Sequence, residues 1–282
     1  PECHNTKARI YGTKEYIDVS GAWHDAGDYG RYIVAAAKSV VDLMMAYEFY
    51  PEAMSIEFDV PKNSNGLPDI LEEIKYELDW MLKMQDKKTG GVYHKVTCRE
   101  FPGFVMPQEE TDELVLSAIS NTATGDFAAI MAKASVVYKD IDPEFSAKAL
   151  DGAIKAYAYL EEHKSAQSFK NPADILTGEY PDGQFKDEMY WASVELYKVT
   201  GDEKYKAYFE DSLQNYVLTG FGWSSMGSYG NVAYLSLDEK DQNPELIKKL
   251  KEEVDKFEEK VTKENGSIKI KINQIQIIQI YY

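Results

Sequence analysis

This 282-residue sequence has little that would support a disulfide-rich, membrane-spanning or nucleic-acid-binding protein. Its two cysteines, Cys3 and Cys98, cannot build a disulfide framework and leave the redox compartment undecided. No stretch approaches the ~20 consecutive apolar residues of a membrane-spanning helix. The residues from Pro1 onward do not have the pattern of a signal peptide, so we expect the sequence to start after processing or within a protein. Lys and Arg number 31 against 48 Asp and Glu, a net charge of −17, and without a basic stripe to release counterions we expect no nucleic-acid partner.

The rest of the composition is that of a soluble globular protein. Charged residues make up 28% and hydrophobic residues 44% of the chain, and the length allows one or two domains with a large core. Aromatic residues reach 13%, including 21 Tyr. This excess is compatible with stacking on sugar rings, although packing in a core is the more common reason for it.

Two kinds of helical segment alternate along the chain. Segments that are apolar nearly all round predict buried helices at 31–47, 124–138, 187–200 and 226–237. Segments with one apolar stripe predict amphipathic helices at 69–85, 144–162, 203–213 and 244–262. Short connections make each pair an antiparallel αα-hairpin, so successive buried helices run parallel and can line an inner ring. The sequence therefore predicts an all-α fold of the α/α-barrel type, with an ordinary helical bundle as the competing interpretation.

Such a ring would place the starts of all buried helices at one end. The segments just before them would then meet around one cavity mouth; they are 23–30, 111–123, 178–186 and 221–225. The span from 86 to 121 is also long for a simple connection, and long loops in compact domains are usually functional.

The last residues differ from everything before them. No acidic residue follows Glu264, and residues 268–282 read IKIKINQIQIIQIYY, a strand-like and aggregation-prone alternation. The Ile-rich tail 265–282 is either a covered edge strand or the product of a shifted reading frame, and the residues alone leave both open.

The strongest local motif is DVSGAWHDAGDYGRY at residues 18–32. Asp25 and Asp28 are three positions apart, which at a helix start puts both carboxylates on one side. Two like charges this close raise the pKa of one group and leave the other ionised as a base that can activate water. A capped and solvated turn is the competing interpretation.

The run from Asp18 to Glu48 resembles the N-terminal signature of glycoside hydrolase family 9, the inverting cellulases. Further similar stretches follow in the same order: NGLPDILEEIKYELDWMLKMQD, GGVYHKVTC, FVMP, NTATGDFAAIMAKAS and DEMYWASVELYKVTGDEKY. The resemblance implies an (α/α)6 barrel, in agreement with the hairpin pattern. It also implies that residues 1–282 are one catalytic domain, C-terminally incomplete, with about four of six hairpins present.

The resemblance also implies roles for the two aspartates. Asp28 matches the catalytic base, and Asp25 matches the residue that helps to hold the nucleophilic water. An inverting enzyme needs ~6.5–9.5 Å between its base and its acid to admit that water. The acid of the family is a Glu near the end of its domain, which we expect to lie outside this chain. The nearby carboxyls that could replace it are Glu109, Glu110, Glu179 and Glu188.

Two metal sites follow from the resemblance. Cys3 and His4 match a pair that holds structural zinc in some bacterial relatives; zinc takes four ligands, so the others would lie before Pro1. Asp187 and Glu188 match a calcium site of some members. The competing interpretations are a terminus without metal and a capped first helical turn. The chemistry itself needs no cofactor.

Candidate sugar-binding residues are aromatic or lie near the cavity mouth. Trp223, Tyr180 and Trp23 could stack on glucose rings, and Tyr29 belongs to the same mouth. In the loop before FVMP, His94 and its neighbour Tyr93 are further candidates for a subsite. As core residues, the aromatic ones would need no ligand.

One departure from the family concerns Ala22, which stands where the SGGW signature usually has its second Gly; we expect the change to be tolerated. The function implied is endo-acting hydrolysis of β-1,4-glucans such as cellulose by a secreted enzyme. The alternatives are an exo-acting cellobiohydrolase or exo-glucosaminidase and a non-catalytic sugar-binding fragment. Carbohydrate-binding, Ig-like or dockerin modules could flank the chain, and a membrane is not an expected partner.

Overall fold

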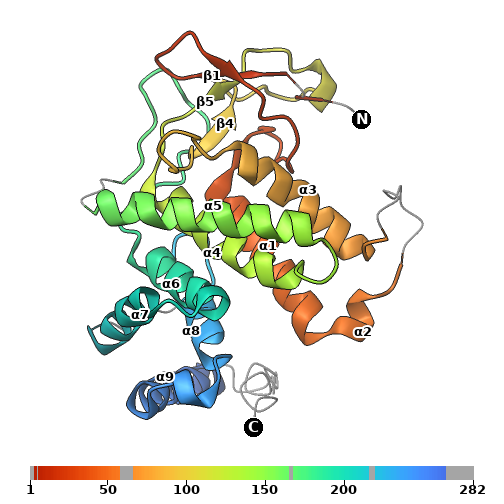
Figure 1. Cartoon of the computed structure of the whole chain (residues 1–282). Coiled ribbons are helices and arrows are strands. Elements are labelled where there is room, and N and C mark those ends of the chain that lie inside the picture. Colours follow the sequence, from red (N-terminus) through yellow and green to blue (C-terminus); the bar gives the residue numbers. More distant parts are fainter. Residues whose placement is uncertain (1–2, 5, 58–65, 165–167, 216–219, 265–282) are drawn as a thin grey trace.

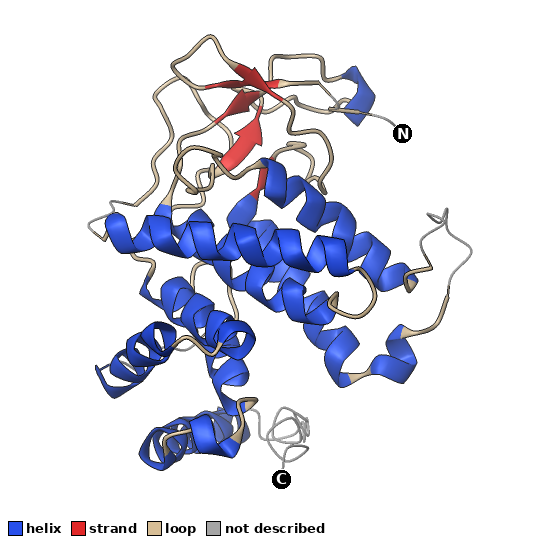
Figure 2. Ribbon diagram, viewed as in Figure 1, coloured by secondary structure: helices blue, strands red, loops and turns tan. Residues whose placement is uncertain are grey.

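The computed structural model describes residues 3–4, 6–57, 66–164, 168–215 and 220–264, so the Ile-rich tail 265–282 lies outside the described residues. Eight helices of nine residues or more appear in this part of the chain (Figures 1 and 2). They are α1 (Ile33–Phe49), α3 (Asp69–Lys83), α4 (Asn121–Val137), α5 (Pro143–Glu162), α6 (Lys186–Thr200), α7 (Glu203–Asn215), α8 (Gly227–Leu235) and α9 (Pro244–Glu264). Short helices are α2 (Pro51–Met54), η1 (Pro107–Glu109) and η2 (Glu239–Asp241).

The helices form an inner row and an outer row. α1, α4, α6 and α8 pack against one another in that order, while α3, α5 and α7 pack against α1, α4 and α6 respectively, and α9 contacts α7. The residues explain the arrangement, because α4 is buried from Asn121 to Ser135 and α6 from Asp187 to Tyr197. α1 is buried along one face, and on its exposed side Asp42 accepts a hydrogen bond of 2.6 Å from the hydroxyl of Tyr229 on α8.

Local residues explain where α5 begins and where α6 ends. Asp142 caps α5, and its side chain accepts a hydrogen bond of 3.1 Å from the backbone N–H of Phe145. Gly201 ends α6 with a φ of 65°, in the left-handed region that glycine adopts without steric cost. Within the described residues, none of the helices is both long and apolar enough to cross a bilayer.

The chain is not all-α, because a five-stranded sheet lies at one end of the helices (Figure 2). Its order is β2-β1-β5-β4-β3, in which β1 and β5 are parallel and the other neighbours antiparallel. The strands are β1 (Ala8–Ile10), β2 (Tyr16–Ile17), β3 (Arg31–Tyr32), β4 (Lys95–Thr97) and β5 (Val115–Leu116). Strands of two or three residues leave no readable alternation, and Arg31–Tyr32 had been assigned to the first helix. The sheet ties the long 86–121 segment to the start of α1.

Ala22 adopts a φ of 76°, a left-handed conformation that costs an L-residue about 1 kcal/mol relative to glycine. We therefore expect Ala22→Gly to raise the free energy of unfolding by about 1 kcal/mol in urea denaturation. Ala26→Gly is the control, because Ala26 is exposed and its φ is not positive, so that change should not stabilise the protein. A loss of stability in Ala22→Gly would contradict the argument.

Candidate active site

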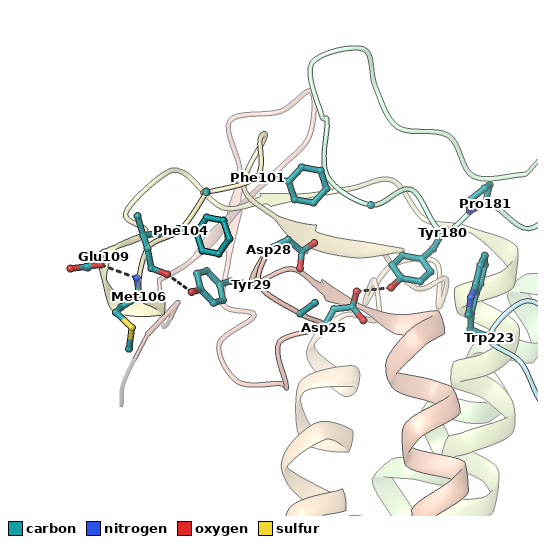
Figure 3. A pocket seen from close by; sticks show the side chains of 15 residues that line it. Asp25, Asp28, Tyr29, Phe101, Phe104, Met106, Glu109, Tyr180, Pro181 and Trp223 are labelled. Atoms are coloured by element: carbon teal, nitrogen blue, oxygen red, sulfur yellow. Dashed lines mark hydrogen bonds between the residues drawn. The ribbon is translucent and has the colours of Figure 1, made fainter.

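A cavity of about 970 Å³ opens beside the start of α1 (Figure 3). Three of the four segments predicted to meet at a cavity mouth do contribute to its wall, through residues 25–29, through Gly178, Tyr180 and Pro181, and through Trp223. The fourth, 111–123, does not line the cavity. Its place is taken by residues between Phe101 and Glu109, because β5 draws 115–116 into the sheet and leaves the preceding loop at the rim.

A tight turn presents Asp25 and Asp28 to the cavity. The backbone N–H of Asp25 donates to the carbonyl of Gly30 at 2.8 Å, and Tyr29 takes a left-handed φ of 53° within the turn. The two carboxylates therefore project from a loop before β3, and not from the first turn of a helix as the spacing had suggested. Both line the cavity, and their catalytic roles remain a prediction.

Asp28 is held by two donors. Its Oδ2 accepts a 2.5 Å hydrogen bond from the hydroxyl of Tyr32, and its Oδ1 accepts one of 3.2 Å from the backbone N–H of Gly30. Burial, and next the hydrogen bond to Asp28, raise the pKa of Tyr32, so this hydroxyl keeps its proton and donates. A Cβ at Gly30 would lie 2.6 Å from the Tyr32 ring, so only glycine leaves room for this contact.

A buried cation lies behind this pair. Lys95 is fully buried, its amine donates to the carbonyl of Gly178 at 2.6 Å, and it lies 5.5 Å from the centre of the Tyr32 ring. Burial lowers the pKa of Lys95 to about 8, while the charge of Asp28 acts in the opposite direction. Lys95 thus supplies positive charge on the protein side of Asp28 at neutral pH and below.

Asp25 is held by an aromatic wall. The hydroxyl of Tyr180 donates to Asp25 Oδ2 at 2.5 Å, and burial foremost raises the pKa of Tyr180. The Tyr180 ring lies 5.0 Å from the Trp223 ring, edge to face, and 4.7 Å from that of Tyr32. Tyr180 and Trp223 both line the cavity, and their contact with sugar rings stays a prediction.

Two predicted substrate-binding residues lie outside the cavity. His94 is buried; its ring nitrogens contact Ser120 Oγ at 2.8 Å and the Glu179 carbonyl at 3.0 Å. Burial lowers its pKa to about 3, so it is a neutral core residue. The indole of Trp23 donates to Glu73 at 2.6 Å. Tyr29 does line the cavity, and its hydroxyl donates to the carbonyl of Val105.

Of the four carboxyls considered as replacement acids, only Glu109 lines the cavity. Its Oε2 accepts from the backbone N–H of Met106 at 2.8 Å, and Figure 3 shows it beyond Tyr29, directed away from Asp28. Glu110 contacts His4 at 2.8 Å, and Glu179 accepts from the backbone of Asn171.

Sequence reasoning missed Tyr32, Lys95 and the apolar rim around Phe104. Tyr32 looked like one more residue of an apolar helix. The sequence did contain a signal for Lys95. A lysine inside the mostly apolar run GGVYHKVTC is either exposed on a strand or buried with partners for its amine.

A group of cysteine and histidine side chains, which are residue types able to bind metal, lies near the N-terminus. Atoms of Cys3, His4 and His24 lie within 4.8 Å of one another, and the Cys3 Sγ is 3.9 Å from His24 Nε2. His4 Nε2 contacts Glu110, while its Nδ1 is buried without a hydrogen-bond partner. Burial, and next the neighbouring His4, lower the pKa of His24 to about 4, which leaves it neutral. His24, which belongs to the aspartate motif, thus lies beside the predicted pair Cys3 and His4.

A second group consists of buried carboxylates between inner helices. Asp126 on α4 and Glu188 on α6 are fully buried, and none of their carboxylate oxygens has a hydrogen-bond partner in the described chain. Asp187 and Asp182 lie close enough to act on both through their charges. Burial foremost, and mutual repulsion next, raise the pKa of Asp126 and Glu188 well above their ordinary values.

Comparisons with known proteins agree with the geometry. A cellodextrinase of Butyrivibrio fibrisolvens is 36% identical over 284 residues, an alignment that covers 94% of this chain and 52% of the relative. A xyloglucan-specific endo-beta-1,4-glucanase of Bacteroides ovatus is 38% identical over 262 residues, covering 87% and 44%. The chain spans about half the length of these curated relatives.

Solved structures give the same result. The crystal structure of a single mutant of a thermostable endoglucanase from Alicyclobacillus acidocaldarius superposes with a TM-score of 0.85 at 41% identity, covering 89% of this chain and 48% of that one. The model of glycosyl hydrolase family 9 matches residues 1–280. With its aspartate pair and aromatic wall at one cavity, and this match along nearly its whole length, the chain belongs to glycosyl hydrolase family 9.

Proposed function

We propose that this chain forms the base side of an inverting β-1,4-glucan hydrolase site. The observation that carries the proposal is the Asp28 carboxylate in the cavity, held by Tyr32 and Gly30. Such a carboxylate can accept a proton from water while the water oxygen bonds to the anomeric carbon. Asp25, fixed by Tyr180, would help to hold the same water.

The proposed step is a single displacement. The bond between water and the anomeric carbon forms on the face opposite the leaving oxygen, the water proton passes to Asp28, and the glycosidic bond breaks. The leaving oxygen takes a proton from a carboxylic acid. Glu109 is turned toward Met106, so we propose that this acid lies outside the described residues. The helix rows would then belong to an (α/α)6 barrel, the fold of the solved relatives.

The substrate we propose is a β-1,4-glucan such as cellulose, cut internally, because the cavity has wall residues on both sides of Asp28 (Figure 3). An exo-acting cellobiohydrolase or exo-glucosaminidase of the same family, or a non-catalytic sugar-binding fragment, is the alternative. Since cellulose is an insoluble polymer, we propose that the enzyme acts as a secreted protein, and carbohydrate-binding, Ig-like or dockerin modules could accompany it.

The test uses a substrate that needs no acid. The phenolate of 2,4-dinitrophenyl β-cellobioside leaves without protonation, so we expect the chain to hydrolyse it while leaving carboxymethyl-cellulose uncut. Proton NMR during the first turnovers should show α-cellobiose, the inverted product. Release of β-cellobiose would contradict the single displacement, and turnover of neither substrate would favour the non-catalytic alternative. Comparable rates on both substrates would place an acid within the chain.

A structural zinc site belongs to the same proposal. Cys3, His4 and His24 would hold the ion, and Glu110 would fix the ring of His4 so that its unpartnered Nδ1 is free to bind. Zinc would join the N-terminal segment to the aspartate motif and supply no catalytic step.

We expect Co²⁺ to bind with the visible absorption of a thiolate ligand and to raise the melting temperature. His24→Ala should weaken Co²⁺ binding at least about 10-fold. His163→Ala is the matched control, because His163 stacks on Tyr159 and is not part of the metal group. Equal Co²⁺ affinity in all three proteins would contradict the site.

A structural calcium site is proposed at Asp187 and Glu188, joined by Asp126 and Asp182. Hard cations such as Ca²⁺ prefer carboxylate oxygens. The carboxylate oxygens of Asp126 and Glu188 accept no hydrogen bond from the described residues, so they would be available to bind the ion. The ion would offset the repulsion within the group and lock α6 against α4.

A further inference from the structure

Lys95 is a buried lysine behind the cavity wall. It is the first residue of β4, which lies between β5 and β3 in the sheet (Figure 1). Its side chain is fully buried and does not line the cavity. Lysine is seldom fully buried unless its charge has partners. Because an apolar side chain could fill such a space without taking a charge out of water, the partners of this amine indicate what it does.

On one side, the partners of Lys95 belong to the segment that leads to Tyr180. The amine donates to Thr177 Oγ1 at 3.0 Å, to the Thr177 carbonyl at 3.4 Å and to the Gly178 carbonyl at 2.6 Å. Two positions later, Tyr180 adopts a left-handed φ of 48° and donates its hydroxyl to Asp25. Such a backbone conformation persists only where the surroundings fix it, and Lys95 is one of the groups that hold this segment.

On the other side, the partner of Lys95 is Tyr32, which holds Asp28. Tyr32 and Lys95 are paired across β3 and β4, and the amine lies 5.5 Å from the centre of the Tyr32 ring. Gly178 packs against the same ring, because a Cβ there would lie 3.2 Å from the Tyr32 hydroxyl oxygen. A shift of Lys95 or Gly178 would therefore move the hydroxyl that donates to Asp28.

Charge links Lys95 to the same carboxylate. The charged groups that act on its amine are Asp28 and Glu179, and both oppose burial, which lowers the pKa of Lys95 to about 8. The titratable groups beside it are the Tyr32 hydroxyl, whose pKa burial raises, and His94, whose pKa burial lowers to about 3. Both of these groups are therefore neutral at pH 7, while the amine is charged and attracts Asp28.

We propose that Lys95 is a positioning residue of the hydrolytic reaction. Its contacts fix the hydroxyl donors of both aspartates, Tyr32 directly and Tyr180 through the segment that precedes it. Its charge favours the ionised carboxylate of Asp28, which accepts the proton of the attacking water. Lys95 does not line the cavity, so it acts through these residues and not on the sugar. The inference rests on the proposed function.

The experiment compares Lys95→Met with the unsubstituted chain on 2,4-dinitrophenyl β-cellobioside. Methionine is similar in length and carries no charge. We expect kcat to fall at least about 10-fold and KM to change much less, because the base is misplaced while the cavity wall is kept.

The pH profile separates positioning from mere support of the fold. This substrate needs no acid, so the fall of kcat/KM toward low pH reports the base. In Lys95→Met this fall should begin at a pH higher by about one unit, because an opposite charge nearby favours the ionised form of a carboxylate. A side chain that only supported the fold would lower kcat/KM by the same factor at every pH.

Lys133→Met is the matched control, because Lys133 is also buried and pairs with Glu48 but does not line the cavity. Its loss should lower the melting temperature without moving the pH profile. Lys95→Arg keeps the charge, so its kcat/KM should fall at the same pH as that of the unsubstituted protein, even where kcat is lower.

An unmoved pH profile in Lys95→Met would overturn the inference, as would an equal shift in Lys133→Met. In both cases normal hydrolysis by the unsubstituted chain leaves the proposed function standing. If the unsubstituted chain hydrolyses nothing, both proposals are contradicted.

A second measurement applies if Lys95→Met does not fold. Heteronuclear NMR can follow the protonation of the Lys95 amine in the unsubstituted protein and in Asp28→Asn. Because the coupling between two groups is reciprocal, the amine should lose its proton at a lower pH in Asp28→Asn, again by about one unit. The same titration in both proteins would overturn the inference.

Discussion

Asp28→Ala is expected to slow hydrolysis of 2,4-dinitrophenyl β-cellobioside by about 10²- to 10⁴-fold, the usual contribution of a general base. Without this carboxylate, the attacking water loses the group that we propose accepts its proton, and the Asp25 carboxylate is engaged by Tyr180. Binding of cellohexaose should change little, because the carboxylate acts on water rather than on the sugar. Initial rates and calorimetry measure the two effects.

Asp238→Ala is the matched control, since the Asp238 carboxylate is 79% exposed and pairs only with Lys240 among the described residues. Added azide provides a second check, because this small anion needs no base. In Asp28→Ala it should restore rate and yield α-cellobiosyl azide. A near-normal rate in Asp28→Ala, or no azide product, would remove Asp28 from the role of base.

The second large effect is expected at Glu188. Its pKa is raised in the folded protein, so its contribution to stability is present below its ordinary value of 4.5 and is lost as pH rises toward the raised folded pKa. In EDTA at pH 7, Glu188→Gln should therefore raise the free energy of unfolding by about 1–3 kcal/mol, since glutamine avoids the free energy needed to bury or to protonate this carboxylate on folding. Urea denaturation from pH 4 to 8 measures this, and the gain should shrink toward pH 4.

With calcium present, the unsubstituted protein should become more stable than Glu188→Gln. At a concentration 100 times its dissociation constant, Ca²⁺ would stabilise the unsubstituted protein by about 2.7 kcal/mol, and Glu188→Gln should lose most of that gain. Glu144→Gln is the control, because Glu144 is 82% exposed. A destabilised Glu188→Gln protein in EDTA, or equal calcium stabilisation in both, would contradict the site.

The sequence was most informative where one pattern extends over many residues. The apolar runs of α4 and α6 predicted buried helices because burial on all sides needs an apolar residue at nearly every position. The carboxylate pair was found from its spacing and glycines. Its local structure was not predicted, because the same residues are compatible with the start of a helix and with the turn that Asp25 and Gly30 close.

What could not be predicted depends on contacts between distant residues. His94 looked available for a sugar, but Ser120 and the Glu179 carbonyl take up its nitrogens. Tyr32 and Lys95 gain their importance from Asp28 and Gly178, which no local periodicity reveals. The strands were invisible because pairing, not propensity, defines segments of two residues.

The hydrogen bond between Tyr180 and Asp25 joins residues 155 positions apart, and Trp223 is still farther along the chain. A nascent polypeptide cannot display a competent groove until the segments before α1, α6 and α8 have met, since each contributes residues to its wall. Assembly of the groove is consequently a late folding event that closes a long loop. An immobilised oligosaccharide would then retain only molecules in which the segment of Asp25 has packed against those of Tyr180 and Trp223. A bound glucan would slow the unfolding step that separates these segments.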